Sequence, residues 1–402
     1  MRMLPIPVAA LATALVVVLP LPQAAADILV VRAESGVEPG DWAPLVNATL
    51  ARAEPGDTVV LSSRREAYEI RSAITIDRDG ITLEGTGATV RFADNAMGGK
   101  IIDCIEVVGT PEDPVEGVIV RGFTIDANYW NQPSSHNPRG FDSDHATGLL
   151  VKDVTITNAF VGLTFGMGVG DASAVGCRVT RYFDDAFNAS GDGVSGGCRG
   201  IEFVDCVAED APNEVSPGTF DPITGGAGGP AGHRNNAWEI EDGAQDVRVI
   251  RCVVRNVDGN GFAVRNHGGE VATSGVVFEG CRAESVRGFG WHVFSGGYPN
   301  TVEDITLRDC TTDSVVRLHK DIRGLTLRSC DFGAAVTLGP CRGMVATGCS
   351  FTWLRIWAQT VNGGEPPAGY VSGYRFENCT VDRPLWILGD PSLVRFPGAP
   401  AR

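Results

Sequence analysis

The residues of this sequence whose types and spacing could do chemistry are Glu239 and Glu241, in the stretch "NNAWEIED" at 235–242. Side chains two residues apart on a β-strand point to the same face, about 7 Å from each other. If this stretch is a strand, its two carboxylates share one surface. There they could divide acid and base roles, because a close like charge raises the pKa of one partner. They could also hold a hard cation through their oxygens, or simply form the solvated face of a strand.

Four further stretches align with this one and indicate which side chains accompany the glutamates. The aligned stretches are 161–167, 184–190, 235–241, 259–265 and 288–294. The alignment predicts one inward column of Thr164, Phe187, Trp238, Phe262 and Trp291. It predicts two outward columns, which hold Phe165, Asn188, Glu239, Ala263 and His292, and Met167, Ser190, Glu241, Arg265 and Phe294. Asp192 and His267 come one position further out.

Stacked strands lie about 4.8 Å apart, so the two outward columns form one patch that carries both signs of charge. Ala263 leaves a gap in this patch that a substrate could occupy. The predicted catalytic residues are Glu239, Glu241, Arg265, His267, His292 and Asp184. Asp185 lies in a separate column with Asn236 and Asn260, and this column is interpreted as satisfying backbone groups at the start of the strands.

The elements that must position this patch follow from an internal repeat. Alternating aliphatic residues, a cysteine or other small residue and a short polar run recur with irregular steps, as in "GIEFVDCVAED" and "DITLRDCTTD". Short repeated strands without helical spacing between them indicate a solenoid of stacked strands whose turns differ in length. The Gly- and Pro-rich stretch at 211–234 is interpreted as one long loop beside the patch.

The chain has 11 cysteines, and eight of them share one inward column. A buried stack of small apolar residues explains this column better than disulfide bonds do. The column holds Cys177, Cys206, Cys252, Cys281, Cys310, Cys330, Cys349 and Cys379. Cys104, Cys198 and Cys341 lie outside it and cannot be paired from the sequence.

The two ends of the chain predict its location and its caps. Arg2, the apolar run 4–23 and three alanines read as a secretory signal peptide over 1–26. We therefore expect a secreted protein, extracellular or periplasmic, with no membrane span in the mature chain. The stretch 41–53 has helical spacing with Asp41 as N-cap, so 27–80 is predicted as a cap with the first strands. The β-helix is expected over 81–390 and a tail over 391–402.

The net charge of −16 gives no overall attraction for nucleic acid or for an anionic membrane surface. The cap helix, "PGDTVVL", "ITLEGTG" and the aliphatic-cysteine turns together resemble the right-handed parallel β-helix proteins of the pectin-lyase-like superfamily. This resemblance implies an all-β solenoid with a short N-terminal capping helix. It also implies carbohydrate-active chemistry on a polysaccharide or oligosaccharide.

Hydrolysis of glycosidic bonds is the first hypothesis for the reaction. An inverting glycosidase needs two carboxylates about 6.5–9.5 Å apart, and a glutamate pair on one strand face meets that spacing. Glu239 is assigned as the acid and Glu241 as the base, with no cofactor. The stretch "DDAFNASG" at 184–191 looks like the "DD…SG" stretch of polygalacturonases, although their Asn-Thr-Asp and Gly-His-Gly motifs are absent here.

A Ca²⁺-dependent polysaccharide lyase is the first alternative. "EIE…VRNHGG" is similar to the pattern of the chondroitinase B and alginate lyase family, which implies that Asn188, Glu239 and Glu241 hold Ca²⁺ beside a uronate carboxylate. The family's arginine is matched by Arg265, but its lysine base is missing from "DGAQD" at 242–246, and an extra Asn266 separates the arginine from the histidine. His267 or His292 would then remove the C5 proton. Hydrolysis ranks above it because the patch holds more carboxylates than bases.

A non-catalytic, glycan-binding solenoid is the second alternative. Tyr129, Trp130, Tyr298 and Trp353 could stack on sugars in any of the three cases, if they are exposed. Ordinary packing beneath a loop is an equally good account of these aromatic residues.

Overall fold

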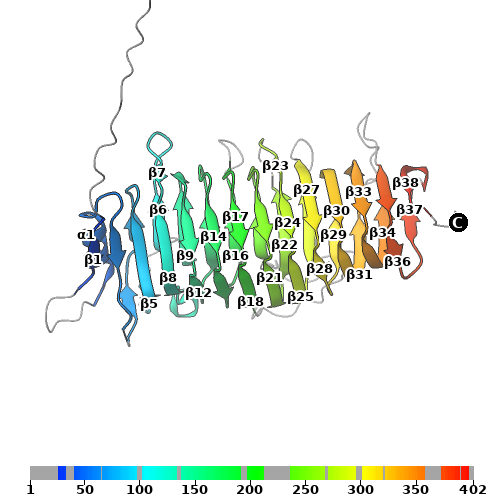
Figure 1. The fold of residues 1–402 in the computed structure, drawn as a ribbon. Helices are drawn as coiled ribbons and strands as arrows, with labels where there is room; N and C mark the ends of the chain where they lie inside the picture. Colours follow the sequence, from blue (N-terminus) through cyan, green and yellow to red (C-terminus); the bar gives the residue numbers. More distant parts are fainter. Residues whose placement is uncertain are drawn as a thin grey trace, which may run out of the picture.

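The computed structural model describes residues 26–32, 40–64, 66–96, 102–133, 137–191, 197–211, 236–267, 270–295, 301–319, 322–357, 373–389 and 391–397. The chain coils into a right-handed parallel β-helix, in which strands of one turn pair in parallel with those of the next. Figure 1 shows the turns stacked in chain order from the N-terminal to the C-terminal end. The predicted fold class is confirmed.

The strands form separate parallel ladders on three faces of the coil. The first face contains β1 (Ile28–Val30), β2 (Thr58–Val60), the first halves of β5 (Thr82–Phe92) and β8 (Ile119–Asp126), β11 (Leu150–Lys152), β14 (Ser173–Val175), β17 (Glu202–Val204), β20 (Arg248–Ile250), β24 (Val277–Glu279), β27 (Val302–Arg308), β30 (Ile322–Arg328), β33 (Met344–Thr347), β35 (Tyr374–Glu377) and β38 (Val394–Arg395).

The second face follows the cysteine turn of each coil. It contains β3 (Tyr68–Ile70), the second halves of β5 and β8, β12 (Thr155–Thr157), β15 (Arg178–Thr180), β18 (Val207–Ala211), β21 (Val253–Val257), β25 (Arg282–Val286), β28 (Thr311–Thr312), the first halves of β31 (Asp331–Leu338) and β34 (Ser350–Trp357), and β36 (Thr380–Val381).

The third face carries the aligned stretches of the sequence. It contains β4 (Ile74–Ile76), β6 (Asp103–Val108), β9 (Arg139–Asp144), β13 (Val161–Phe165), β16 (Asp185–Ala189), β19 (Asn236–Ile240), β22 (Asn260–Asn266), β26 (Trp291–Ser295), β29 (Val316–Leu318), the second halves of β31 and β34, and β37 (Trp386–Leu388). Short elements lie between the faces: β7 (Val115–Glu116), β10 (Ala146–Thr147), β23 (Thr273–Ser274), β32 (Cys341–Arg342), η1 (Tyr129–Asn131) and η2 (Pro391–Leu393).

A stack of aromatic rings inside the coil fixes the register of the third face. Phe187, Trp238, Phe262 and Trp291 are all fully buried. Successive ring centroids along this stack lie 4.5, 5.0 and 4.9 Å apart. Burying each ring contributes about 1.5–3 kcal/mol. Because side chains alternate along a strand, this stack turns the residues at 239 and 241 away from the interior, as predicted.

The predicted register of β13 is wrong by one residue. Leu163, not Thr164, pairs with Phe187, and Thr164 pairs with Asn188. Phe165 is therefore an inward, fully buried residue instead of an outward one. The physical reason is that Leu163 and Phe165 are both apolar and two residues apart, so the core accepts this pair and turns the hydroxyl of Thr164 outward.

The cysteine column is confirmed as a stack of buried thiols. All 11 cysteines are free, and all but Cys379 are buried. Their thiols donate to backbone carbonyls of the preceding turn, as Cys206 Sγ does to Ala174 O at 3.3 Å and Cys281 Sγ to Val249 O at 3.1 Å. The column therefore packs the corner between the first and second faces without covalent bonds.

A short helix, α1 (Ala43–Leu50), packs against β4 at the N-terminal end, where a cap was predicted. The N-cap residue is Trp42 rather than the predicted Asp41. The Asp41 carboxylate nevertheless accepts the Ala43 N–H at 3.1 Å and the Arg71 N–H at 3.0 Å, so it satisfies one of the free amides at the helix start.

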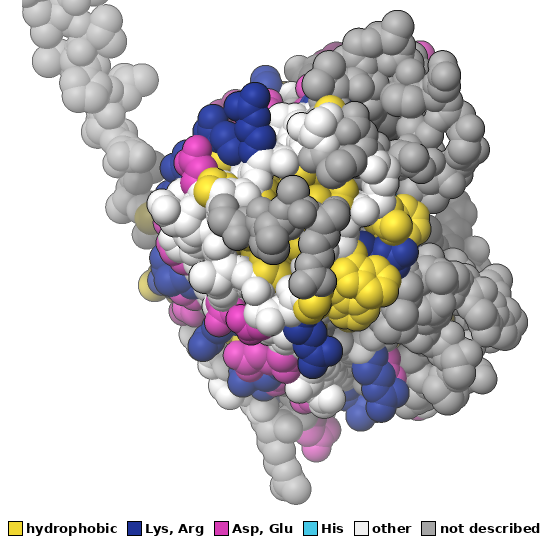
Figure 2. Space-filling model, turned by 90° about the vertical axis from the view of Figure 1, so that its right-hand side faces the viewer, with side chains coloured by type: hydrophobic (Ala, Val, Ile, Leu, Met, Phe, Trp, Pro, Cys, Tyr) yellow, Lys and Arg dark blue, Asp and Glu magenta, His cyan; other side chains and the backbone are white. Residues whose placement is uncertain are grey.

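Hydrophobic side chains gather at the C-terminal end of the solenoid, which faces the viewer in Figure 2. Trp386 and Leu388 on β37 are exposed, by 51% and 42%. Within the described ranges, no helix is both long and apolar enough to cross a membrane. The predicted signal peptide lies almost wholly outside the described residues and stays a prediction.

Candidate active site

A buried polar ladder runs along the start of three neighbouring strands on the third face. Asp185, Asn236 and Asn260 are paired in register on β16, β19 and β22. Asn236 Nδ2 donates to Asp185 Oδ1 at 2.9 Å, and Asn260 Nδ2 donates to Asn236 Oδ1 at 2.9 Å. Asn260 Oδ1 accepts a backbone N–H from Phe289 at 3.1 Å, as the sequence reading expected for this column. Asp185, in contrast, points its carboxyl group toward the glutamates.

Glu239 is a buried acid of the patch and is 5% exposed. Its Oε2 accepts from Asn236 Nδ2 at 2.9 Å, and its Oε1 lies 2.8 Å from Arg265 Nη1. Burial first, and then the charge of Glu241, raise the pKa of Glu239 to about 7, although Arg265 and a hydrogen bond with Asp185 oppose the shift. The pKa of Asp185 is also raised, first by burial and then by Glu239. Together these two carboxyl groups retain a proton near neutral pH.

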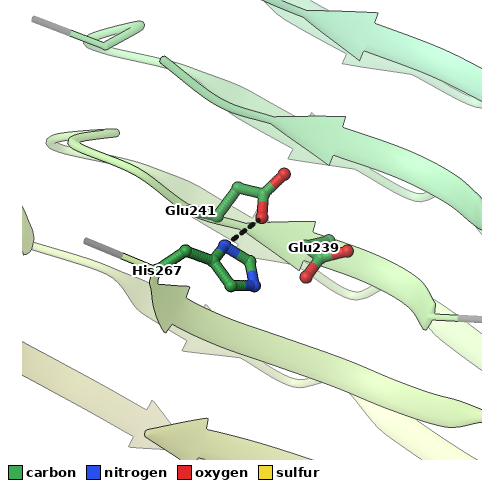
Figure 3. Close-up of side chains that lie close together, drawn as sticks. All are labelled: Glu239, Glu241 and His267. Carbon is green, nitrogen blue, oxygen red and sulfur yellow. Dashed lines mark ion pairs between the residues drawn. The ribbon is translucent and has the colours of Figure 1, made fainter. Parts of the chain in front are cut away.

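Glu241 lies nearer the solvent and joins two further strands to the patch. Its Oε1 accepts from Asn188 Nδ2 at 3.1 Å, and its Oε2 lies 3.1 Å from His267 Nδ1. Figure 3 shows this ion pair beside the Glu239 carboxylate. Asp242 Oδ2 is 3.3 Å from the same nitrogen of His267. Hydrogen bonds to Asp242 and Glu241 raise the pKa of His267 to about 9, so the imidazole is protonated at neutral pH.

We call Asp185, Glu239 and Glu241, with Arg265 and His267, the acid cluster. Arg265 Nη2 also donates to Asn236 Oδ1 at 2.8 Å, so one guanidinium holds an acid and an amide together. The sequence predicts that Glu239, Glu241, Arg265 and Asn188 lie in one patch with His267 at its rim. In the structure these five residues contact one another in this arrangement.

The acid cluster fits a divalent cation. One ligand atom each from Glu239, Glu241 and His267 lies within 4.8 Å of the others. Asn188 is 7% exposed, donates into the cluster through Nδ2, and its buried Oδ1 has no hydrogen-bond partner. Carboxylate and amide oxygens suit a hard cation, and an added imidazole suits a first-row transition metal. The donor set predicted for the lyase alternative, Asn188, Glu239 and Glu241, therefore lies together.

The distance between the carboxylate oxygens of Glu239 and Glu241 also bears on the argument for hydrolysis. An inverting site holds its two carboxyl groups about 6.5–9.5 Å apart to leave room for a water. The strand spacing predicted such a separation, but one oxygen of Glu239 and one of Glu241 lie within 4.8 Å of each other. The reason is that His267 and Arg265 draw both carboxylates toward β22.

The other predicted residues lie at the edges. Asp184 is half-buried just before β16, and its charge raises the pKa of Glu239 and of Asp185. His292 pairs in register with Ala263, which places it two strands from Glu239. Its ring lies 4.7 Å from that of Phe289, 4.7 Å from that of Phe294 and 5.7 Å from that of His319. Asp192 and Tyr298 lie outside the described residues.

Sequence reasoning missed the part that Asp185 and Asn236 play in the cluster. Side chains at the start of these strands contact the outward residue three positions later: Asn236 contacts Glu239 at 2.9 Å, and Arg139 contacts Asp142 at 2.9 Å. The polar column was visible in the sequence, but strand alternation assigns it to the inner side.

A cavity of about 560 Å³ lies on the second face, away from the acid cluster. It is lined by Arg178, Thr180, Arg181, Glu209, Asp210, Ala211, Asn256, Asp258 and Arg287. Its charged groups have partners: Arg287 pairs with Asp258 at 3.1 Å, and Asp210 Oδ1 accepts from Asn256 Nδ2 at 2.7 Å.

Comparison with known proteins shows the fold. No protein-family model and no curated protein sequence matches this chain. Among solved structures, it is similar to the A-module of the mannuronan C-5 epimerase AlgE6 from Azotobacter vinelandii, with 14% identity, a TM-score of 0.63 and coverage of 87% of this chain and 92% of that one. It is also similar to PfbA, a surface adhesin of Streptococcus pneumoniae, with 11% identity, a TM-score of 0.64 and coverage of 88% and 90%. A third is the DFA-IIIase of Arthrobacter chlorophenolicus A6, with 12% identity, a TM-score of 0.59 and coverage of 93% and 99%.

Proposed function

We propose that this chain is a secreted enzyme that acts on a polysaccharide through the acid cluster on the third face. A surface that joins carboxyls, an arginine and a histidine from three strands is the arrangement expected of a site that orients a polar polymer. The structural neighbours named as a mannuronan C-5 epimerase and a DFA-IIIase lend support, since each is carbohydrate-active on the same type of scaffold.

The chemistry that the geometry supports best is removal of the C5 proton of a uronate, followed by elimination of the glycosidic bond. The observation that carries this choice is the convergence of ligand atoms from Glu239, Glu241 and His267 within 4.8 Å. The buried, unpartnered Oδ1 of Asn188 adds a fourth donor. This reverses the ranking made from the sequence, because the carboxylates converge on one point instead of flanking a water.

Each residue has a separate part in this proposal. A cation held by Asn188, Glu239 and Glu241, when bound, would neutralise the uronate carboxylate and make the C5 proton more acidic. Arg265 fixes the Glu239 carboxylate through the ion pair at 2.8 Å. His267, with 48% of its side chain exposed, is the group of the cluster best placed to meet a substrate. A cation held by the glutamates would weaken the interaction with Glu241 that helps to keep the imidazole protonated, and the neutral ring would then accept the C5 proton. His292, at the rim, is the alternative base.

Hydrolysis is the second candidate, because one specific observation favours it. A carboxyl group whose pKa is about 7, as burial produces at Glu239, is a general acid poised to protonate a leaving group at neutral pH. Glu241 would then act as the base, and no cofactor would be involved.

One assay separates these chemistries. The mature protein is incubated with a panel of uronate and neutral polysaccharides, with and without a chelator, and both reducing ends and the absorbance of unsaturated uronates are followed. Elimination gives both signals, and the chelator removes both. Hydrolysis gives reducing ends without the absorbance, and uptake of solvent deuterium at C5 without cleavage indicates epimerisation. Binding without any of these changes would leave a non-catalytic solenoid and overturn the proposal.

A further inference from the structure

Four aromatic side chains lie in contact with one another outside the core of the coil. They are Tyr129, Trp130, Phe160 and Phe183, and all are partly exposed. The rings of Phe160 and Phe183 stack at 5.4 Å, and Tyr129 lies 5.2 Å from Phe183 and 4.8 Å from Trp130. Trp130 remains 37% exposed. We call these four residues the aromatic platform. Tyr129 and Trp130 are therefore not wholly covered, although they pack against neighbouring rings.

Backbone hydrogen bonds hold the platform at the start of the strands of the third face. Phe160 N donates to Pro138 O at 2.8 Å, and Phe183 N donates to Ala159 O at 3.0 Å. Tyr129 N donates to Asn158 O at 2.8 Å. Phe160 immediately precedes β13, and Phe183 precedes β16 by one residue. The platform therefore sits on regular turns of the solenoid and is not a chance contact of side chains.

The platform is continuous with the acid cluster through Asp184. This residue follows Phe183 and precedes Asp185. Its backbone N–H donates to Phe160 O at 2.9 Å, and its carbonyl oxygen accepts from Asn236 N at 2.8 Å. One residue thus links the platform to the strand that carries Glu239. A polymer that reaches Glu239 along this edge would meet the platform next.

Polar groups border the platform on its other side. Arg181 Nε donates to Asn158 Oδ1 at 2.9 Å, and Asn158 Nδ2 donates to Asp126 Oδ1 at 2.9 Å. Trp130, the most exposed of the four, lies edge-on to Tyr129 and Phe183, with interplanar angles of 68° and 74°. An exposed ring bordered by amides and charges matches a pyranose ring, whose C–H face is apolar and whose hydroxyls need partners at the edge.

We propose that the aromatic platform is a sugar-binding subsite that stacks a pyranose unit of the same glycan, beyond the units that occupy the acid cluster. This inference rests on the proposed function in taking a glycan as the ligand. The platform adds affinity for longer chains and has no part in the bond that breaks. Its substrate class is therefore a polymer or long oligosaccharide, not a disaccharide.

The test uses Trp130→Ala and Trp130→Phe in the full chain, with oligosaccharides prepared from whichever polysaccharide of the panel is turned over or bound. We expect Trp130→Ala to weaken the binding of oligosaccharides of six or more units by about ten-fold. The affinity for two- or three-unit fragments and their kcat should stay unchanged. Trp130→Phe should restore most of the loss, because a ring is retained. Quenching of tryptophan fluorescence by long fragments should also disappear in Trp130→Ala.

Trp386→Ala is the matched control. Trp386 is exposed and lies edge-on to the ring of Trp353, with the two ring centroids 5.7 Å apart. It lies on the last turn of the third face. The Trp386→Ala variant should bind all fragments as the parent does. Wild-type affinity of Trp130→Ala for long fragments would overturn the subsite and leave the proposed function intact. Binding that depends on Trp130 without any turnover would support the subsite and refute the enzyme. No glycan binding at all would refute both.

Discussion

Arg265 on β22 pairs with Glu239 on β19 at 2.8 Å, although the register of these strands places Ala263, and not Arg265, opposite Glu239. The ion pair is diagonal, and the small side chain of Ala263 leaves the space through which the arginine folds back. The same guanidinium donates to Asn236. A buried carboxylate requires a paired charge and hydrogen bonds, so this diagonal contact is what allows an acid to sit beneath the surface of the third face.

Removing this arginine should destabilise the fold. Arg265→Ala leaves Glu239 buried without its cation, and breaking a buried pair costs about 3–5 kcal/mol. The matched control is Arg248→Ala on the first face, because Arg248 pairs with Glu202 at 2.7 Å in solvent, where such a pair contributes less than about 1 kcal/mol. Chemical denaturation at pH 7 measures both. Similar losses in the two variants would contradict the buried role of the Arg265–Glu239 pair.

Glu241 should be essential for turnover and dispensable for folding. Its side chain is 17% exposed, so Glu241→Gln replaces an acid by an isosteric amide at the edge of the core. Loss of a carboxylate used in acid–base or cation chemistry should lower kcat/KM by at least about 100-fold. Glu202→Gln, on the first face, is the control and should leave the rate unchanged. Wild-type turnover by Glu241→Gln would remove the acid cluster from the reaction.

A divalent cation should stabilise the protein if the cluster binds one. At a concentration about 100 times Kd, a ligand that binds only the folded state adds about 2.7 kcal/mol. We expect an upward shift of the unfolding temperature on titration with Ca²⁺ or Mn²⁺, and a comparison of the two metals shows whether His267 acts as a ligand. The shift should be absent in Glu241→Gln and intact in Glu202→Gln. Equal shifts in both variants would place the cation elsewhere.

The cysteine column should be insensitive to reductant. Because all 11 cysteines are free, dithiothreitol should not change the unfolding temperature. The pKa of Cys177 is raised well above the usual thiol value, mainly by its hydrogen bond with Cys206 and then by burial. The pKa of Cys206 is also raised well above that value, mainly by burial. Folded protein should therefore react slowly with thiol reagents. Denatured protein should expose all of them. A reductant-dependent drop in stability would show that disulfides form after all.

The fold could be predicted from the sequence because its signals are local and repeated. One cysteine or aromatic residue per turn indicates both the period of the repeat and which side chains point inward, as Trp238 and Cys252 do. Where a turn lacks such a residue, the sequence defines the strand register less well. The stretch around Thr164 was placed one residue out, because a threonine was set in the aromatic column when Leu163 was the inward residue.

The site was less predictable, because side-chain direction depends on bends and on long-range contacts. The sequence placed Glu239 and Glu241 on one outer face. It could not show that Arg265 contacts Glu239 and His267 contacts Glu241, and the proposal of a cation site depends on the convergence of these groups. Asp185 was assigned to the backbone because strand alternation alone does not reveal its hydrogen bond with Glu239.

A second group of acids on the same face gives a prediction on pH that is independent of the acid cluster. Asp142 on β9 is 3% exposed and ion-paired with Arg139, which also contacts Asp103. Burial, with the charges of Asp103 and Asp144 adding to it, raises the pKa of Asp142 to about 8, although Arg139 opposes the shift. The folded state therefore keeps a proton that the unfolded chain releases near pH 4. The free energy of unfolding should fall as pH rises from about 4 to 8.

Asp142→Asn should make this dependence less steep, because the amide cannot titrate, while Asp185 and Glu239 still contribute to it. The variant should gain stability relative to the parent toward pH 8. Asp205→Asn is the control: the side-chain hydrogen bond from Arg251 lowers the pKa of this exposed acid, so its contribution is present at neutral pH and is lost only in acid. Denaturation midpoints of the three proteins between pH 4 and 9 provide the measurement. Parallel curves for the parent and Asp142→Asn would show that Asp142 is already ionised in the folded protein, and that Arg139 outweighs its burial.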